Sequence, residues 1–317
     1  MLRWQEFRRI GQALALALIL FLATLAAKKP EPPHGPHEAY DAKAELVVKD
    51  VPYVKGKEHN KKLQLDVYSN PHQGLWPTVV MIHGGAWYKG TKDFDEEVYL
   101  CKVLANHGYV VFTINYRLAP AHHLKTQAED AMAAVIWVKR HAQEYGGDPA
   151  RIGVAGGSAG GHLGALVAWA SDDPYFHPTG QAGSTIDSDV KAAALYYPVL
   201  DLDRTLRDVG KRLTPLARLL FVGRVGKSYR TALTHLSPNH HLKPGDPPSL
   251  FLTGDADGLQ LYPQSVEYQK QLQALGVDAC LFTAAGKDHG FTAQYWDPET
   301  LASTQAMLKL FDQYLKQ

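Results

Sequence analysis

Short apolar runs alternate along this chain with longer segments in which apolar residues recur every three or four positions. The alternation begins near residue 39 and continues to the C-terminus. Short apolar runs bounded by glycine, proline or polar clusters are typical of buried strands, and the longer period is typical of amphipathic helices. The pattern predicts strands over 44–48, 63–68, 78–82, 109–114, 152–155, 192–197, 249–253 and 279–283, and helices over 94–107, 126–145, 159–171, 263–275 and 299–315.

The order of these elements predicts how the strands pair. The first two strands have no helix between them, so we expect them to form an antiparallel start. The later strands are separated by helices, which implies parallel pairing with both faces of the sheet covered. We therefore predict the α/β class, with a mostly parallel, twisted sheet of about eight strands and helices on both faces. No internal repeat is found in the sequence, and residues 39–317 are expected to form one domain.

One segment interrupts this rhythm. Residues 198–248, after the sixth predicted strand, form a long insertion without a clear strand. Its basic part, 204–230, contains one acid, Asp208, against Arg204, Arg207, Lys211, Arg212, Arg218, Arg224, Lys227 and Arg230. An amphipathic helical face is formed there by Leu213, Leu216, Leu219, Leu220 and Phe221. Long insertions are often lids or binding loops. A cap over a functional site, a packing helix with a solvated basic face and a membrane-surface contact all remain open.

The N-terminal segment predicts a location. Three arginines before residue 10 precede an uncharged, Leu- and Ala-rich run over 10–27, which is followed by Lys28 and Lys29. This is the form of a secretory signal, and the run is also just long enough to span a bilayer. A cleaved signal peptide and a membrane anchor both remain open for 1–27. We expect a Pro-rich linker over 28–38, membrane contact through the N-terminal segment if it is an anchor, and a domain that works outside the cytoplasm.

Composition excludes several classes of function. The 317 residues are 45% hydrophobic and 21% charged, which is ordinary for a protein with a substantial core. A net charge of +1 gives no case for nucleic-acid binding. Cys101 and Cys280 are too few for a disulfide framework, and we expect two buried thiols. The adjacent histidine pairs at 122–123 and 240–241 cannot easily ligate one metal ion, so no metal and no cofactor are expected.

The most informative motif lies at 156–160 (Gly-Gly-Ser-Ala-Gly), directly after the apolar run 151–155. A strand that ends in Gly-x-Ser-x-Gly and opens into a helix is typical of a nucleophile elbow, which projects the serine hydroxyl from the top of a sheet. Glycine on either side lets strand and helix approach closely. A serine is a weak nucleophile, so Ser158 requires an adjacent base and an acid that orients this base.

Both partners are found downstream in the order that this architecture requires, Ser, then Asp, then His. Asp257 lies in the loop after the strand over 249–253, and His289 lies in a Gly-flanked loop after the strand over 279–283. Each is at the C-terminal end of a strand, where ligands bind in open α/β sheets. Asp255 follows the glycine that ends the strand and is better placed to pin the turn. Asp288 could hold His289, although neighbouring side chains tend to point apart; Asp257 is preferred.

Stabilisation of an oxyanion is the third requirement. The strand over 78–82 ends in the segment 83–87 (His-Gly-Gly-Ala-Trp), which matches the glycine-rich loop that supplies amides to an oxyanion hole. We predict that the donors are the backbone amides of Gly84, Gly85 and Ala159, the last being the residue after the nucleophile. Trp87 and Tyr88 either line an acyl pocket or pack in the core.

These motifs occur in the order found in α/β-hydrolase esterases. They are the segments 83–87, 115–120 (Asn-Tyr-Arg-Leu-Ala-Pro) and 156–161, with the loops of Asp257 and His289. Over roughly 62–315 the chain resembles the carboxylesterase and feruloyl-esterase-like group beside the hormone-sensitive-lipase-like enzymes. The resemblance implies the α/β-hydrolase fold and a cofactor-free hydrolase of carboxylic esters. Gly157 stands where the lipase-like enzymes usually have Asp, and Ala86 where many have a third Gly; both differences favour the carboxylesterase group.

The hypothesis is a serine hydrolase of small-molecule esters, in which Ser158 attacks, His289 transfers the proton and Asp257 orients the imidazole. Two alternatives remain open: an amidase of kynurenine-formamidase-like type or a peptidase, and a non-catalytic binding protein on the same fold. If the basic insertion is a cap, we expect a preference for anionic esters that weakens with salt. Acyl length and oligomeric state are not predicted.

Overall fold

A computed structural model describes residues 45–54, 62–178, 187–208 and 227–317. Three predictions lie outside these residues: the signal or anchor at 1–27, the linker at 28–38, and the five apolar residues that give the insertion its amphipathic face. Within the described part of the chain, no helix combines the length and the apolar character needed to cross a membrane.

The strands form one sheet in the order β1-β2-β4-β3-β5-β6-β7-β8. Their bounds are β1 Glu45–Pro52, β2 Gln64–Ser69, β3 Trp76–Ile82, β4 Val110–Ile114, β5 Gly147–Gly157, β6 Ala192–Tyr196, β7 Ser249–Gly254 and β8 Ala279–Ala284. Strand β2 is antiparallel to both β1 and β4, and every other pair is parallel. The predicted eight-stranded, mostly parallel sheet with an antiparallel start is confirmed.

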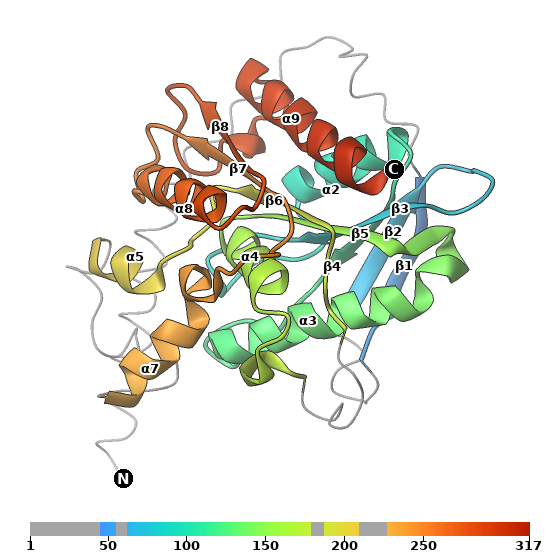
Figure 1. The fold of residues 1–317 in the computed structure, drawn as a ribbon. Coiled ribbons are helices and arrows are strands. Elements are labelled where there is room, and N and C mark those ends of the chain that lie inside the picture. Colours follow the sequence, from blue (N-terminus) through green and yellow to red (C-terminus); the bar gives the residue numbers. More distant parts are fainter. Residues whose placement is uncertain (1–44, 55–61, 179–186, 209–226) are drawn as a thin grey trace, which may run out of the picture.

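Helices cover both faces of this sheet (Figure 1). Helices α3, α4 and α8 contribute to the hydrophobic core on one face, and α2 and α9 to the core on the other. The α-helices are α2 Asp95–Asn106, α3 Leu124–His141, α4 Ala159–Trp169, α5 Leu202–Asp208, α7 Lys227–Leu236, α8 Tyr262–Ala274 and α9 Pro298–Leu315. Short 3-10 turns are η2 Ala142–Tyr145, η3 Pro174–Phe176, η5 Pro238–His241 and η6 Phe291–Ala293.

Burial on both faces explains why the central strands are continuously apolar. In β3, Val80 and Ile82 belong to the core under α3 and α4, whereas Val79 and Met81 belong to the core under α2 and α9. All four side chains are fully buried. Because successive strand residues point to opposite faces, a strand covered on both sides needs an apolar residue at every position.

The differences from the predicted elements have physical causes. Strand β5 starts at Gly147, earlier than predicted, because Gly147 and Asp148 pair with Trp76 and Pro77 of β3. The apolar pattern did not reveal this part of the strand, because its residues are not hydrophobic. Cys101 is buried as predicted, but Cys280 is exposed, so the prediction of two buried thiols is wrong for the second. Cys280 lies on β8, an edge strand of the sheet, where coverage is incomplete.

The start of the insertion is fastened to helix α8. The backbone N–H groups of Leu200 and Asp201 donate to Gln264 Oε1 at 3.2 and 2.9 Å, and Gln264 Nε2 donates to Thr205 Oγ1 at 2.9 Å. Gln264 is fully buried. Since a buried amide that loses its partners costs about 1–3 kcal/mol, this side chain fixes α5 against α8.

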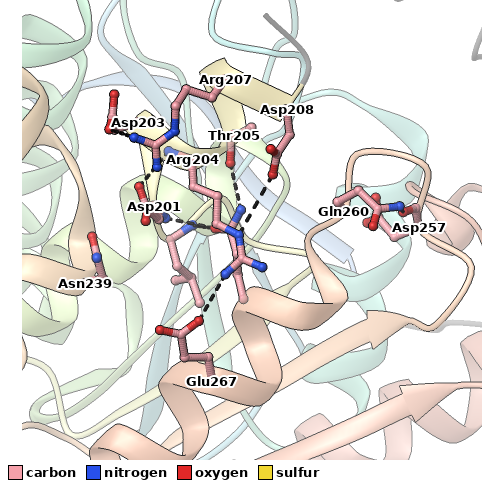
Figure 2. A network of polar contacts seen from close by, with 12 residues as sticks. Asp201, Asp203, Arg204, Thr205, Arg207, Asp208, Asn239, Asp257, Gln260 and Glu267 are labelled. Atoms are coloured by element: carbon pink, nitrogen blue, oxygen red, sulfur yellow. Dashed lines mark hydrogen bonds and ion pairs between the residues drawn. The ribbon is translucent and has the colours of Figure 1, made fainter.

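The two arginines of α5 are paired with acids. Figure 2 shows Arg204 between Asp208 and Glu267, with ion-pair distances of 3.9 and 3.0 Å, and Arg207 beside Asp203. These pairs are partly exposed, so each adds little stability. They do neutralise both guanidinium groups. The predicted preference for anionic esters therefore depends on the basic residues of the insertion beyond α5.

Candidate active site

Ser158 lies on a sharp turn between strand β5 and helix α4. Its φ of 56° is in the left-handed region, which is strained for a residue with a side chain. Two hydrogen bonds hold the turn: the Ser158 N–H donates to the Tyr196 carbonyl at 2.9 Å, and the Ser158 carbonyl accepts from the His162 N–H at 2.9 Å. The predicted nucleophile elbow is therefore present in the fold, at the C-terminal edge of the sheet.

Close packing of the elbow against the end of β3 requires a glycine at position 160, two residues after the serine. A Cβ built on Gly160 would lie 2.0 Å from the carbonyl oxygen of Ile82 and 2.7 Å from that of His83. Since both are backbone atoms, no side chain fits at position 160 without displacing β3.

The side chains of Ser158, His289 and Asp257 form a continuous hydrogen-bonded chain. The distance from His289 Nε2 to Ser158 Oγ is 2.9 Å, and that from His289 Nδ1 to Asp257 Oδ2 is 3.0 Å. An ionised carboxylate only accepts, so Nδ1 carries the proton and Nε2 presents its lone pair to the hydroxyl. The Asp257 side chain is fully buried, whereas that of His289 is 22% exposed. The imidazole next to Ser158 is therefore partly accessible from solvent, whereas the carboxylate of Asp257 is shielded from it.

The three candidate acids have different positions. Asp255 Oδ1 accepts from the Gly286 N–H at 2.6 Å, and Asp288 Oδ1 accepts from the N–H groups of Gly258 and His289 at 2.8 and 2.6 Å. Both fasten the loop after β7 to the loop after β8. Of the three carboxylates, the structure places that of Asp257 against the imidazole ring.

The predicted oxyanion loop differs from expectation at Gly84. Its N–H donates to Glu97 Oε1 at 2.8 Å, and Glu97 is a buried residue of α2. An amide that already donates to a carboxylate is not available to a substrate, so the prediction for Gly84 is wrong.

Three other backbone amides, two in this loop and one at the start of α4, are not occupied in this way. Among the described residues, the N–H groups of Gly85, Ala86 and Ala159 have no hydrogen-bond acceptor. For Ala159 this follows from its place at the start of α4, where the N–H groups of the first turn lack intrahelical partners.

Buried polar residues that the sequence did not single out support this edge of the sheet. Tyr197, just after β6, has a φ of 33° and packs its ring edge-on to His289, with centroids 4.8 Å apart. Its hydroxyl shares a hydrogen bond with Thr292. Asp130 of α3 is buried in an ion pair with Arg117, with Oδ1 2.6 Å from Nη2.

Two histidines beside the site are buried and neutral. Burial lowers the pKa of both His83 and His162 to about 4. His83 stacks on Tyr116 with centroids 4.3 Å apart, and its Nδ1 lies 2.7 Å from the Gly84 carbonyl. Across the described ranges, no group of three or more His, Cys, Asp or Glu side chains could hold a metal ion.

The fold and the elbow define this chain as an α/β-hydrolase. Residues 65–272 match the model of the BD-FAE family, and the chain belongs to this family. The resemblance to α/β-hydrolase esterases is thereby confirmed.

Several proteins with similar sequences or structures have names that describe them as esterases. "Probable carboxylic ester hydrolase LipM" of Mycobacterium tuberculosis is 33% identical over 219 residues, covering 68% of this chain and 50% of LipM. "Carboxylesterase NlhH" of the same organism is 32% identical over 225 residues, covering 68% of this chain and 66% of NlhH. The chain thus spans about half to two thirds of the length of these relatives. The apo structure of Thermogutta terrifontis esterase 2 matches with a TM-score of 0.65 and 26% identity, covering 90% of this chain and 96% of that one.

Proposed function

We propose that this protein is a serine carboxylesterase that hydrolyses small-molecule carboxylic esters through an acyl-enzyme. The observation that carries the proposal is the hydrogen-bonded chain from Asp257 through His289 to Ser158. Nucleophile, base and orienting acid are each within hydrogen-bond reach of the next, which is the geometric signature of an activated serine.

In the first half of the reaction, Ser158 Oγ attacks the ester carbonyl carbon while its proton passes to His289 Nε2. Asp257 accepts from His289 Nδ1–H and stabilises the imidazolium that forms. The tetrahedral intermediate then collapses: the bond to the alcohol oxygen breaks, and the alcohol leaves with the proton from Nε2. The acyl group remains bonded to Ser158 Oγ.

The negative charge on the former carbonyl oxygen is stabilised by the amides of Gly85, Ala86 and Ala159 in this proposal. Their N–H groups come from the loop after β3 and from the start of α4. Loss of one such donor typically costs about 10²–10³ in rate.

The second half repeats these steps with water. Water gives a proton to His289 Nε2 and attacks the acyl carbon; collapse of the second intermediate releases the carboxylic acid, and Ser158 regains its proton from the imidazolium. The protein returns to its starting state without any further co-reactant.

The comparisons support this proposal. Beside the relatives that are named as esterases, a structure of Thermogutta terrifontis esterase 2 phosphorylated by paraoxon matches this chain with 25% identity and a TM-score of 0.65. Phosphorylation by paraoxon is the behaviour expected of an activated nucleophile in such a site.

Hydrolysis of nitrophenyl esters tests the proposal. We expect the protein to release nitrophenol from short-chain esters, and Ser158→Ala to reduce kcat by at least about 10⁴. A series of acyl lengths from acetate to decanoate would define the acyl pocket. Equal rates for the protein and Ser158→Ala would contradict the serine mechanism. Absence of hydrolysis across the whole series would favour a binding protein on this fold.

A further inference from the structure

A hydrogen-bond chain through the fully buried His162 of helix α4 joins the oxyanion loop to the insertion. The indole Nε1–H of Trp87 donates to His162 Nδ1 at 3.2 Å, and His162 Nε2 lies 2.7 Å from the carbonyl oxygen of Leu236. Trp87 directly follows Gly85 and Ala86, two of the proposed oxyanion donors. Leu236 is the last residue of α7 in the insertion. His162 thus stands between the two segments.

Both partners of His162 have a fixed direction of hydrogen bonding. The Leu236 carbonyl can only accept, so His162 Nε2 must carry a proton. The indole nitrogen of Trp87 can only donate, so His162 Nδ1 must be unprotonated. One neutral tautomer alone satisfies both contacts, and the complete burial of His162 favours this neutral form. The carbonyl at the end of α7 therefore selects the tautomer that can accept from Trp87.

The oxyanion loop needs such support because its backbone is strained. Ala86 and Trp87 have φ values of 49° and 62°, in the left-handed region that residues with side chains avoid. Such conformations persist only where surrounding contacts determine them. The Trp87 carbonyl accepts from Gln127 Nε2 and from the Ala119 N–H, each at 2.9 Å. His162 adds a side-chain contact to these two backbone anchors.

His162 is also part of the nucleophile's own turn. Its N–H donates to the Ser158 carbonyl at 2.9 Å, and its ring meets that of Trp87 edge-on with centroids 5.3 Å apart. One residue therefore contacts the nucleophile backbone, the oxyanion loop and the insertion.

We propose that His162 is a positioning residue that holds the oxyanion loop in register with Ser158 and couples this loop to the end of α7. The inference rests on the proposed esterase function. It assigns the indole of Trp87 an anchoring role. It also predicts that a displacement of α7 lowers kcat more than it raises KM, because the amides of the coupled loop stabilise the oxyanion of the transition state.

Three variants separate the contacts of His162. His162→Asn places an amide oxygen near the position of Nδ1, so the acceptor for Trp87 is kept and the contact to Leu236 is lost. His162→Gln places its amide nitrogen near the position of Nε2, so the contact to Leu236 is kept and the acceptor is lost. Trp87→Phe keeps an aromatic ring and removes the N–H.

We expect His162→Gln and Trp87→Phe each to lower kcat about tenfold with KM changed less than twofold. The affinity for a trifluoromethyl ketone, which forms a tetrahedral adduct on serine, should fall by the same factor. His162→Asn should lower kcat less than His162→Gln does, because it keeps the acceptor for Trp87 while losing the contact to Leu236. The double variant His162→Gln/Trp87→Phe should equal either single one, because both remove the same contact.

The outcomes distinguish this inference from the proposed function. If the unaltered protein hydrolyses esters in a Ser158-dependent way but His162→Gln and Trp87→Phe keep full kcat, the positioning role is wrong and the function stands. Additive losses in the double variant, or a loss of kcat without loss of affinity for the ketone, would also overturn it. If His162→Gln does not fold, Trp87→Phe alone decides. Absence of hydrolysis by the unaltered protein would contradict the proposed function itself.

Discussion

The ring of Tyr197 occupies the space beside Gly157 that a side chain at that position would need. A Cβ built on Gly157 would lie 3.1 Å from both Cε2 and Oη of Tyr197. The same ring packs edge-on to His289. Gly157, the residue before the proposed nucleophile, is therefore coupled to the proposed base His289 through one buried aromatic side chain. A larger residue at position 157 would have to displace the ring of Tyr197.

The first prediction is that Gly157→Asp, which introduces the residue usual in the lipase-like group, lowers kcat about tenfold. The new side chain displaces Tyr197, and with it the support of His289. Tyr197→Leu should lower kcat as well, but the double variant should lose less than the sum, with a coupling of about 0.5–3 kcal/mol. Ester hydrolysis by the four proteins of this cycle measures the coupling, and strictly additive effects would refute it.

The second prediction separates the three carboxylates. Asp257→Asn should lower kcat by about 10⁴, because an amide at this position favours the wrong imidazole tautomer. Asp255→Asn and Asp288→Asn serve as matched controls, since within the described part of the chain both carboxylates accept from backbone amides of the two loops. Each should cost less than about tenfold in kcat. A larger loss in Asp288→Asn than in Asp257→Asn would reassign the orienting acid.

The third prediction concerns Glu97, whose carboxylate accepts from the Gly84 amide. Glu97→Ala leaves this buried amide without its acceptor, at a cost of about 1–3 kcal/mol in the free energy of unfolding. Glu97→Gln retains an oxygen at the site and should cost less. Urea unfolding of the three proteins provides the measurement. Equal destabilisation by Ala and Gln would show that the Gly84 contact contributes little.

The fourth prediction is a loss of stability in mild acid. Burial lowers the pKa of His83 and of His162 to about 4, below the ordinary value of about 6.5 that applies in the unfolded chain. Between these values the unfolded chain binds protons that the folded protein does not, so stability is complete above about pH 6.5 and falls as the pH approaches 4. The expected loss is on the order of 3 kcal/mol for each histidine.

Carboxylates also titrate in this range, so the acid effect is isolated with a variant. His162→Asn removes one of the two groups, and its unfolding free energy should fall less between pH 7 and 4.5 than that of the unaltered protein. Parallel losses in the two proteins would show that His162 does not contribute.

The sequence was sufficient to predict those site residues that lie directly after a strand of the sheet. In a mostly parallel sheet the C-terminal ends of neighbouring strands meet at one edge, so an elbow after one strand and loops after two later strands had to approach one another. Ser158, Asp257 and His289 lie on such segments. Their order and spacing were sufficient to select them from the chain.

Side-chain contacts between different elements of the fold could not be predicted from the sequence. The amide of Gly84 is occupied because helix α2 brings Glu97 beside it, and Asp130 is buried because α3 packs against the loop of Arg117. Tyr197 is an aromatic residue at a strand end, with no local pattern that distinguishes it from core residues. These side chains acquire their roles from packing, which periodicity and spacing do not encode.

The central claim is that Ser158 is the activated nucleophile, and covalent labelling tests it most directly. The protein is incubated with paraoxon, digested and analysed by mass spectrometry, with Ser158→Ala and Asp257→Asn as controls. We predict one diethyl phosphate adduct per chain on Ser158, loss of ester hydrolysis in proportion to labelling, no adduct in Ser158→Ala and slower labelling of Asp257→Asn. An adduct on another residue, or full hydrolysis by a protein completely labelled at Ser158, would contradict the account.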